Sequence, residues 1–96
     1  MEKSVYALTF LYEGCDDSYP YAMTLAVSDD REKLIEKLDE YIEEDTADDE
    51  EDIWNEDCNF KVNENWRSDN YVGVILQHKA RTNLYQKYTI RKVDFL

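Results

Sequence analysis

The sequence predicts an α+β fold in which an antiparallel sheet of four to five strands carries one amphipathic helix packed on one face. Segments rich in aromatic and β-branched residues lie near both ends of the chain, and such segments are typical of strands. A single segment between them repeats its apolar residues with the period of a helix. The chain has 96 residues and no internal repeat, so residues 1–96 are expected to form a single domain.

The first two strands are predicted at residues 4–12 and 20–27. The polar segment at residues 13–18 contains Gly14 and is typical of a turn. Pro20 fits the first position of a strand, because no backbone donor is needed there. Together these segments predict an N-terminal hairpin.

A helix is predicted to begin after residues 28–30 and to run to about residue 44. Asp29 and Glu32 have the spacing of a capping box, in which two unpaired backbone N–H groups are satisfied reciprocally. One stripe of this helix is apolar and consists of Leu34, Ile35, Leu38, Tyr41 and Ile42. The opposite face is acidic and carries Glu32, Glu36, Asp39, Glu40 and Glu43.

Residues 43–52 hold eight acidic residues in ten positions. Like charges at this density oppose compaction, and acidic residues at a helix C-terminus oppose the helix dipole. We therefore expect an exposed helix end and loop around 43–52. Residues 53–60 are compatible with a short helix or an irregular turn.

The C-terminal part of the sequence predicts a second hairpin. Residues 60–63 are expected to form a short strand, and residues 71–78 and 84–95 two longer ones joined by a loop at 79–83. In the last strand two sets of residues alternate, which predicts one partly solvated face. The first set is Tyr85, Lys87, Thr89, Arg91 and Val93, and the second is Gln86, Tyr88, Ile90, Lys92 and Asp94.

The charge is unevenly distributed along the chain. With 23 acidic and 11 basic residues the net charge is −12. Residues 1–58 hold 20 acidic and 4 basic residues, whereas residues 59–96 hold 3 acidic and 7 basic residues. This charge repels nucleic acid and anionic membranes, so neither is expected to bind directly, and a basic protein is the expected partner.

Location is predicted from what the sequence lacks. No apolar run approaches the ~20 residues that cross a bilayer, and the N-terminus does not have the pattern of a signal peptide. Two cysteines, Cys15 and Cys58, do not make a disulfide framework. A cytoplasmic protein with reduced thiols is therefore expected.

The sequence carries no catalytic motif, so we predict that the protein is not an enzyme. His78 is the only histidine, and no nucleophile motif accompanies it. A structural zinc site needs about four ligands, and Cys15, Cys58 and His78 are too few. A calcium loop that starts at Asp48 places Ile53 where the EF-hand requires glycine. No cofactor or metal site is predicted, although weak divalent-cation binding by the acidic loop stays open as an alternative.

The acidic helix face and loop are the strongest candidate for a binding surface. Their carboxylates recur about once per helical turn, roughly every 5 Å along the axis, and duplex DNA presents phosphates about every 3.4 Å per strand. Such a row can occupy a groove in which lysine and arginine normally hold phosphate, with Trp54, Trp66 and nearby tyrosines as apolar anchors. The predicted partner-binding residues are Glu36, Asp39, Glu40, Glu43, Glu44, Asp48, Asp49, Glu50, Glu51, Asp52 and Trp54. Reversing the charges of residues 48–52 is expected to slow association more than it alters the fold.

In size, in the acidity of residues 29–57 and in its lack of catalytic motifs, the chain resembles small acidic proteins of phages and mobile elements. These include anti-CRISPR and anti-restriction inhibitors, and immunity proteins that neutralise nuclease toxins are similar. The resemblance implies an inhibitor that occupies the nucleic-acid-binding groove of a basic enzyme. Two alternatives stay open: a metal-dependent enzyme, or a small bacterial binding or regulatory module whose acidity only serves solubility. The active surface of such a module would equally be the basic final hairpin, with Lys79, Arg81, Lys87, Arg91 and Lys92.

Overall fold

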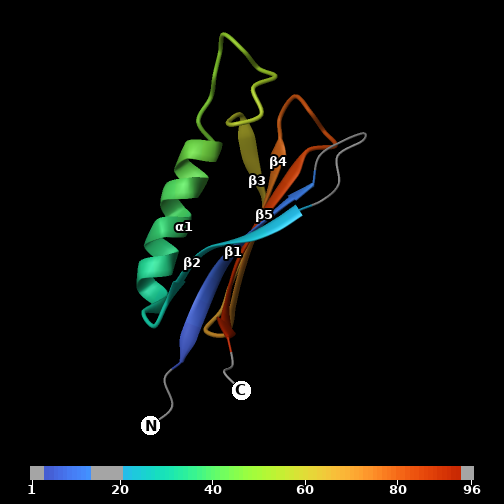
Figure 1. Cartoon of the computed structure of the whole chain (residues 1–96). Coiled ribbons are helices and arrows are strands. Elements are labelled where there is room, and N and C mark those ends of the chain that lie inside the picture. The colour runs from blue at the N-terminus through green and yellow to red at the C-terminus, as the bar shows by residue number, and fades with distance from the viewer. Residues whose placement is uncertain (1–3, 14–20, 94–96) are drawn as a thin grey trace.

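The computed structural model describes residues 4–13 and 21–93. They form, in chain order, β1 (Val5–Glu13), β2 (Tyr21–Ser28), α1 (Arg31–Asp45), β3 (Phe60–Arg67), β4 (Tyr71–His78) and β5 (Tyr85–Val93). The five strands make one antiparallel sheet, and α1 packs along one of its faces (Figure 1), which confirms the predicted α+β class. Within these residues no helix is long and apolar enough to cross a membrane.

The sheet joins the two ends of the chain. Its strand order is β2-β1-β5-β4-β3, so the first and last strands lie side by side near the centre. Val5 is paired with Val93, and Glu13 is paired with Tyr85. The N-terminal hairpin and the β3–β4–β5 meander are therefore two halves of one sheet, with β2 and β3 as its edges.

The strand β3 is longer than the sequence predicts. It was expected over residues 60–63, but it continues to Arg67 and is irregular between Val62 and Glu64. After Phe60 every side chain of this edge strand is exposed, so no alternation of apolar and polar residues marks it. The predicted turn at residues 13–18 falls, apart from Glu13, outside the described residues, as does Pro20.

The start of α1 differs by one residue from the predicted capping box. The N-cap is Asp30, whose Oδ1 accepts the Glu32 N–H at 3.1 Å. Ser28 is still paired with Tyr6 in the sheet, so the chain enters the helix only after Asp29. At the other end the helix stops at Asp45, close to the predicted boundary.

The helix buries the apolar stripe that the sequence predicts. Leu34 and Leu38 are fully buried against the sheet. Tyr41 stacks on Tyr88 of β5, with ring centroids 5.7 Å apart. These side chains belong to a single core of Leu8, Leu34, Leu38, Phe60, Val72, Val74, Leu76, Leu84, Tyr88 and Ile90, with Ile35 and Ile42 packed against it.

The second face of the sheet is covered by no helix or strand of the part of the chain that the structure describes. We call it the open face. The Tyr71 ring lies over Gly73 on this face, since a Cβ at residue 73 would be 2.8 Å from the ring. Its larger side chains come from β1, β3, β4 and β5 and include Leu11, Trp66, Tyr71, Ile75, Tyr85, Lys87 and Arg91.

The Gln86 amide oxygen is a buried polar atom without a partner among the described residues. The Gln86 side chain is buried, and its Oε1 accepts no hydrogen bond from residues 4–13 or 21–93. Replacing Gln86 with methionine keeps the shape and removes this group, so we expect the free energy of unfolding to rise by about 1 kcal/mol in urea denaturation. Gln77→Met is the control. The Gln77 amide donates to Thr82 O, so we expect its loss to lower the free energy of unfolding. A loss of stability in Gln86→Met would contradict the prediction.

Candidate partner-binding surface

The predicted binding residues lie on α1 and on the loop of residues 46–59 that follows it. The loop extends from the C-terminal end of α1, at the end of the sheet where β4 turns into β5 (Figure 1). All five of the predicted helix residues are exposed: Glu36, Asp39, Glu40, Glu43 and Glu44. We call these five residues, Asp48–Asp52 and Trp54 the acidic surface.

Asn59 holds the two ends of the loop together. Its backbone lies in the left-handed region, with φ 67°, which asparagine tolerates better than most residues. Its Oδ1 accepts the Asp49 N–H at 2.6 Å, and its Nδ2 donates to Asp52 O at 3.0 Å. Its own N–H donates to Ala47 O at 2.8 Å. The loop is therefore an ordered structure and not a frayed helix end.

Two aspartates of the acidic run shape the loop itself. Asp49 Oδ1 accepts the N–H groups of Glu51 and Asp52, at 3.1 and 3.2 Å. Asp52 Oδ1 accepts the Trp54 N–H at 3.1 Å. The hydrogen bond from Asn55, followed by that from the Asp52 N–H, lowers the pKa of Asp49. The loop accordingly loses this support as the pH falls through the folded-state pKa of Asp49.

The hydrogen bonds of Asp49 and Asp52 mean that charge reversal at residues 48–52 would alter the fold of the loop. Reversing all charges of residues 48–52 would remove the Asp49 and Asp52 acceptors and so disrupt the loop as well as its charge. The side chains of Glu50 and Glu51 make no hydrogen bond or ion pair with the described residues. Charge at these two positions is therefore separable from loop structure.

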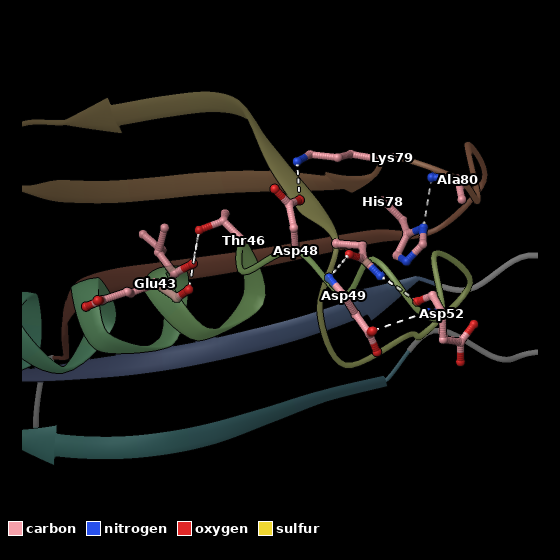
Figure 2. Close-up of polar contacts among 10 residues, drawn as sticks. Glu43, Thr46, Asp48, Asp49, Asp52, His78, Lys79 and Ala80 are labelled. Atoms are coloured by element: carbon pink, nitrogen blue, oxygen red, sulfur yellow. Dashed lines mark hydrogen bonds and ion pairs between the residues drawn. The ribbon is translucent and has the colours of Figure 1, made fainter.

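His78 fastens the loop to the sheet. Its ring is buried at the end of β4. Its Nδ1 accepts a hydrogen bond from the Ala80 N–H at 3.1 Å (Figure 2) and another from the Arg81 N–H at 2.9 Å. Nε2 therefore carries the proton and donates to Asn55 O at 2.8 Å. Both ring nitrogens are used in structural contacts, in keeping with the histidine at a strand end that the sequence predicts.

Cations from other elements pair with part of the acidic surface. Lys79 approaches Asp48 at 2.6 Å (Figure 2), and Arg67 of β3 approaches Asp39 at 2.7 Å. Within residues 4–13 and 21–93, no ion pair neutralises the remaining glutamates of this surface, Glu36, Glu40, Glu43, Glu44, Glu50 and Glu51. Most of its carboxylates thus face solvent, where they are available to a partner.

The loop also presents two large apolar side chains. Trp54 is 53% exposed and Ile53 is 55% exposed. The Trp54 ring lies 5.8 Å from the Arg81 guanidinium, which also forms an ion pair with Glu56 at 3.3 Å. The sequence predicts Trp54 as a binding residue but not Ile53, because the exposure of Ile53 depends on the conformation of the loop and not on a local sequence pattern.

The basic residues of the last hairpin do not form one surface. Lys79 and Arg81 are engaged with the loop. Lys87 and Arg91 point to the open face, and Lys92 alternates to the opposite side of β5. The five cations therefore do not lie on one continuous surface, and a binding role of the final hairpin stays a prediction.

Metal-binding and thiol chemistry at this surface depend on the placement of its His, Cys, Asp and Glu side chains. No group of three or more His, Cys, Asp or Glu side chains in the described part of the chain is placed to hold a metal ion. Cys58 forms no disulfide within the described residues, and burial, followed by the carboxylates of Asp49 and Asp57, raises the pKa of its thiol. Cys15 lies outside the described residues, so the structure does not test its pairing.

Asp45 at the end of α1 is held against the core. Its Oδ2 accepts the Tyr88 hydroxyl at 2.5 Å. Burial raises the pKa of Asp45, and this effect exceeds the opposing effect of the Tyr88 hydrogen bond. Burial, followed by the hydrogen bond to Asp45, also raises the pKa of Tyr88.

Asp45→Asn is expected to stabilise the protein at neutral pH. A carboxyl group whose pKa is raised by folding favours the folded state when protonated, and this contribution is lost as the pH rises from the unfolded pKa through the folded one. Asparagine keeps an acceptor for Tyr88 and carries no charge. Chemical denaturation should therefore show a gain over wild type at pH 7 that shrinks toward pH 3. Lower stability of the variant at pH 7 would show that Tyr88 needs the ionised carboxylate.

Comparison with known proteins adds no assignment. No protein-family model, curated protein or solved structure matches this chain.

Proposed function

We propose that this chain is a non-enzymatic interaction protein that binds a basic partner through the acidic surface. The partner surface that it occupies is one that normally holds nucleic acid. The observation that carries the proposal is the concentration of charge on two consecutive ordered elements. Residues 29–58 hold 16 acidic and three basic residues, and the exposed carboxylates of α1 continue into a loop fixed by its own hydrogen bonds.

The order of the loop supports this proposal. A flexible acidic tail would lose conformational entropy on binding, whereas a preorganised loop loses less. Glu36, Glu40 and Glu43 recur about once per turn, roughly every 5 Å, so the helix offers a spaced row of carboxylates. Ile53 and Trp54 add apolar area next to that row, and apolar anchors of this kind are typical of interface hot spots.

The proposed mechanism is occlusion. Carboxylates take the lysine and arginine side chains that would otherwise bind phosphate, so the protein and the nucleic acid compete for one groove. Attraction between opposite charges speeds association, and dissolved salt screens it. Binding is therefore expected to be fast at low ionic strength and to weaken as salt is added.

A capture experiment with competition tests the proposal. The full chain is immobilised and exposed to a cell lysate treated with nuclease to remove nucleic acid. Captured proteins are then released either with sodium chloride or with added duplex DNA. We expect the captured proteins to be strongly basic, and we expect both treatments to release them. Capture of neutral proteins only, or of proteins that DNA does not displace, would contradict occlusion of a nucleic-acid groove.

Matched variants separate the acidic surface from net charge. Glu50→Gln with Glu51→Gln removes two charges from the loop without touching its hydrogen bonds. Glu64→Gln with Asp69→Asn removes two charges from β3 and the turn after it, both exposed. With a captured protein as the probe, the first pair is expected to slow association several-fold at low salt, and the second to change it little. Equal effects would show that only overall charge matters.

A further inference from the structure

The open face carries a projecting side chain and a hollow side by side. Trp66 of β3 is 67% exposed and lies opposite Gly73. Next to it along the strands is a hollow of about 250 Å³, lined by Leu11, Ile75, Lys87 and five further residues, which are Glu13, Asn63, Glu64, Tyr85 and Gln86. Ile75 pairs with Glu64, only two positions from Trp66. A projection and a hollow on one face are what a self-complementary contact requires.

The charge of the open face is nearly balanced. It holds the cations Lys61, Lys87 and Arg91 and the anions Glu13 and Glu64. The excess negative charge lies on α1 and the loop instead. Two copies that meet through their open faces therefore keep their acidic surfaces apart, and each face offers both signs to the other.

The face is large enough for a stable pair. Its strands have eight or nine residues, so with a rise of about 3.3 Å per residue and a strand spacing of about 4.8 Å it covers roughly 650 Å². Two such faces would bury about 1,300 Å², above the ~1,000 Å² expected of a specific interface. Near its centre the face carries the paired small residues Thr9 and Thr89, and beside them the Tyr71 ring fills the space over Gly73.

We propose that two copies of this chain associate through their open faces, with Trp66 of each copy seated in the hollow of the other. A two-fold axis that runs across the strands, between Trp66 and the hollow, exchanges the two features. The pair is then a two-layer sandwich of sheets with a helix on each outside, and both acidic surfaces stay exposed. This inference goes beyond the proposed function and does not depend on it.

A nucleic acid is the competing occupant of a sheet face with aromatic and basic residues. The observations favour a second copy. The net charge of the chain is −12, which repels a polyanion, and the two anions of the face lie among its cations. Binding of a single-stranded oligonucleotide to the open face, reported by Trp66 fluorescence, would overturn the proposal.

Sedimentation velocity of the full chain over a wide concentration range tests the association. We expect a monomer at low micromolar concentration and a species of twice the mass at higher concentration. Raised salt is expected to preserve or strengthen the pair, because it screens the repulsion between two anionic chains. Monomers at every concentration, weakening by salt, or growth beyond the dimer would each overturn the proposal.

The two tryptophans provide a matched pair of variants. Trp66→Arg is expected to raise the dissociation constant of the pair at least tenfold, while Trp54→Arg, at a similarly exposed position in the loop, leaves it unchanged. Thermal unfolding at monomeric concentration checks that both variants fold. In the Trp54→Phe variant, Trp66 is the only tryptophan, and its emission should shift to shorter wavelength as the concentration rises. Equal weakening by both arginine variants, or a constant emission, would overturn the assigned contact.

Discussion

Replacing His78 with alanine is expected to lower the free energy of unfolding by about 3 kcal/mol and to release the loop of residues 46–59 from the sheet. The ring is 1% exposed and packs edge-on against Phe60, with centroids 5.1 Å apart. Its loss leaves Asn55 O and the N–H groups of Ala80 and Arg81 without their partners. A cavity beside Phe60 adds to the effect.

Two measurements check this prediction. Urea denaturation gives the change in stability. Hydrogen exchange follows the N–H groups of Glu51, Asp52 and Trp54, which donate hydrogen bonds to the loop aspartates and should exchange faster once the loop is released. Lys79→Ala is the control at the next position, where an exposed ion pair with Asp48 is lost at an expected cost of less than about 1 kcal/mol. If His78→Ala is no less stable than Lys79→Ala, the histidine does not hold the loop.

Elements that depend on local periodicity were predictable from the sequence. The stripe of Leu34 and Leu38 marks α1 by its helical period, and the short continuous apolar run that ends at His78 marks β4. The strand β3 lacks such a pattern, since its register depends on pairing with β4 and its side chains face solvent. The N-cap is Asp30 and not Asp29, because pairing with β1 extends β2 to Ser28 and the helix begins only after that.

The candidate surface was predictable in position but not in detail. A dense run of acidic residues predicts an exposed surface, because like charges oppose burial. Which carboxylates are engaged depends on residues distant in the chain: Asp39 meets Arg67, and Asp48 meets Lys79. The order of the loop likewise depends on a contact between Asn55 and His78, 23 positions apart. The nearest local signal is the high content of aspartate and asparagine in residues 48–59, a composition typical of turns closed by side chains.

Replacing Leu38 with alanine is the second change with a large expected effect, a loss of about 3–4 kcal/mol in the free energy of unfolding. Leu38 is 0% exposed and is one of two helix residues fully buried against the sheet. The apolar stripe to which Leu38 belongs supplies the buried part of the contact between α1 and the sheet. The polar contacts of α1 with the sheet, Asp39 with Arg67 and Asp45 with Tyr88, are less buried. Urea denaturation followed by far-ultraviolet circular dichroism reports both stability and helix content.

Glu40→Ala is the matched control on the same helix, because Glu40 is exposed and its replacement is expected to change stability by less than about 0.5 kcal/mol. A loss of under about 1 kcal/mol in Leu38→Ala would mean that α1 adds little to the fold. Leu38→Ala and His78→Ala also separate the contributions of the helix and the loop to binding by the acidic surface. Its five helix residues depend on the docking of α1, whereas the loop is fastened separately through His78. Under conditions in which both variants remain largely folded, a partner that needs the helix row should lose affinity for Leu38→Ala, and one that needs the loop should lose more for His78→Ala.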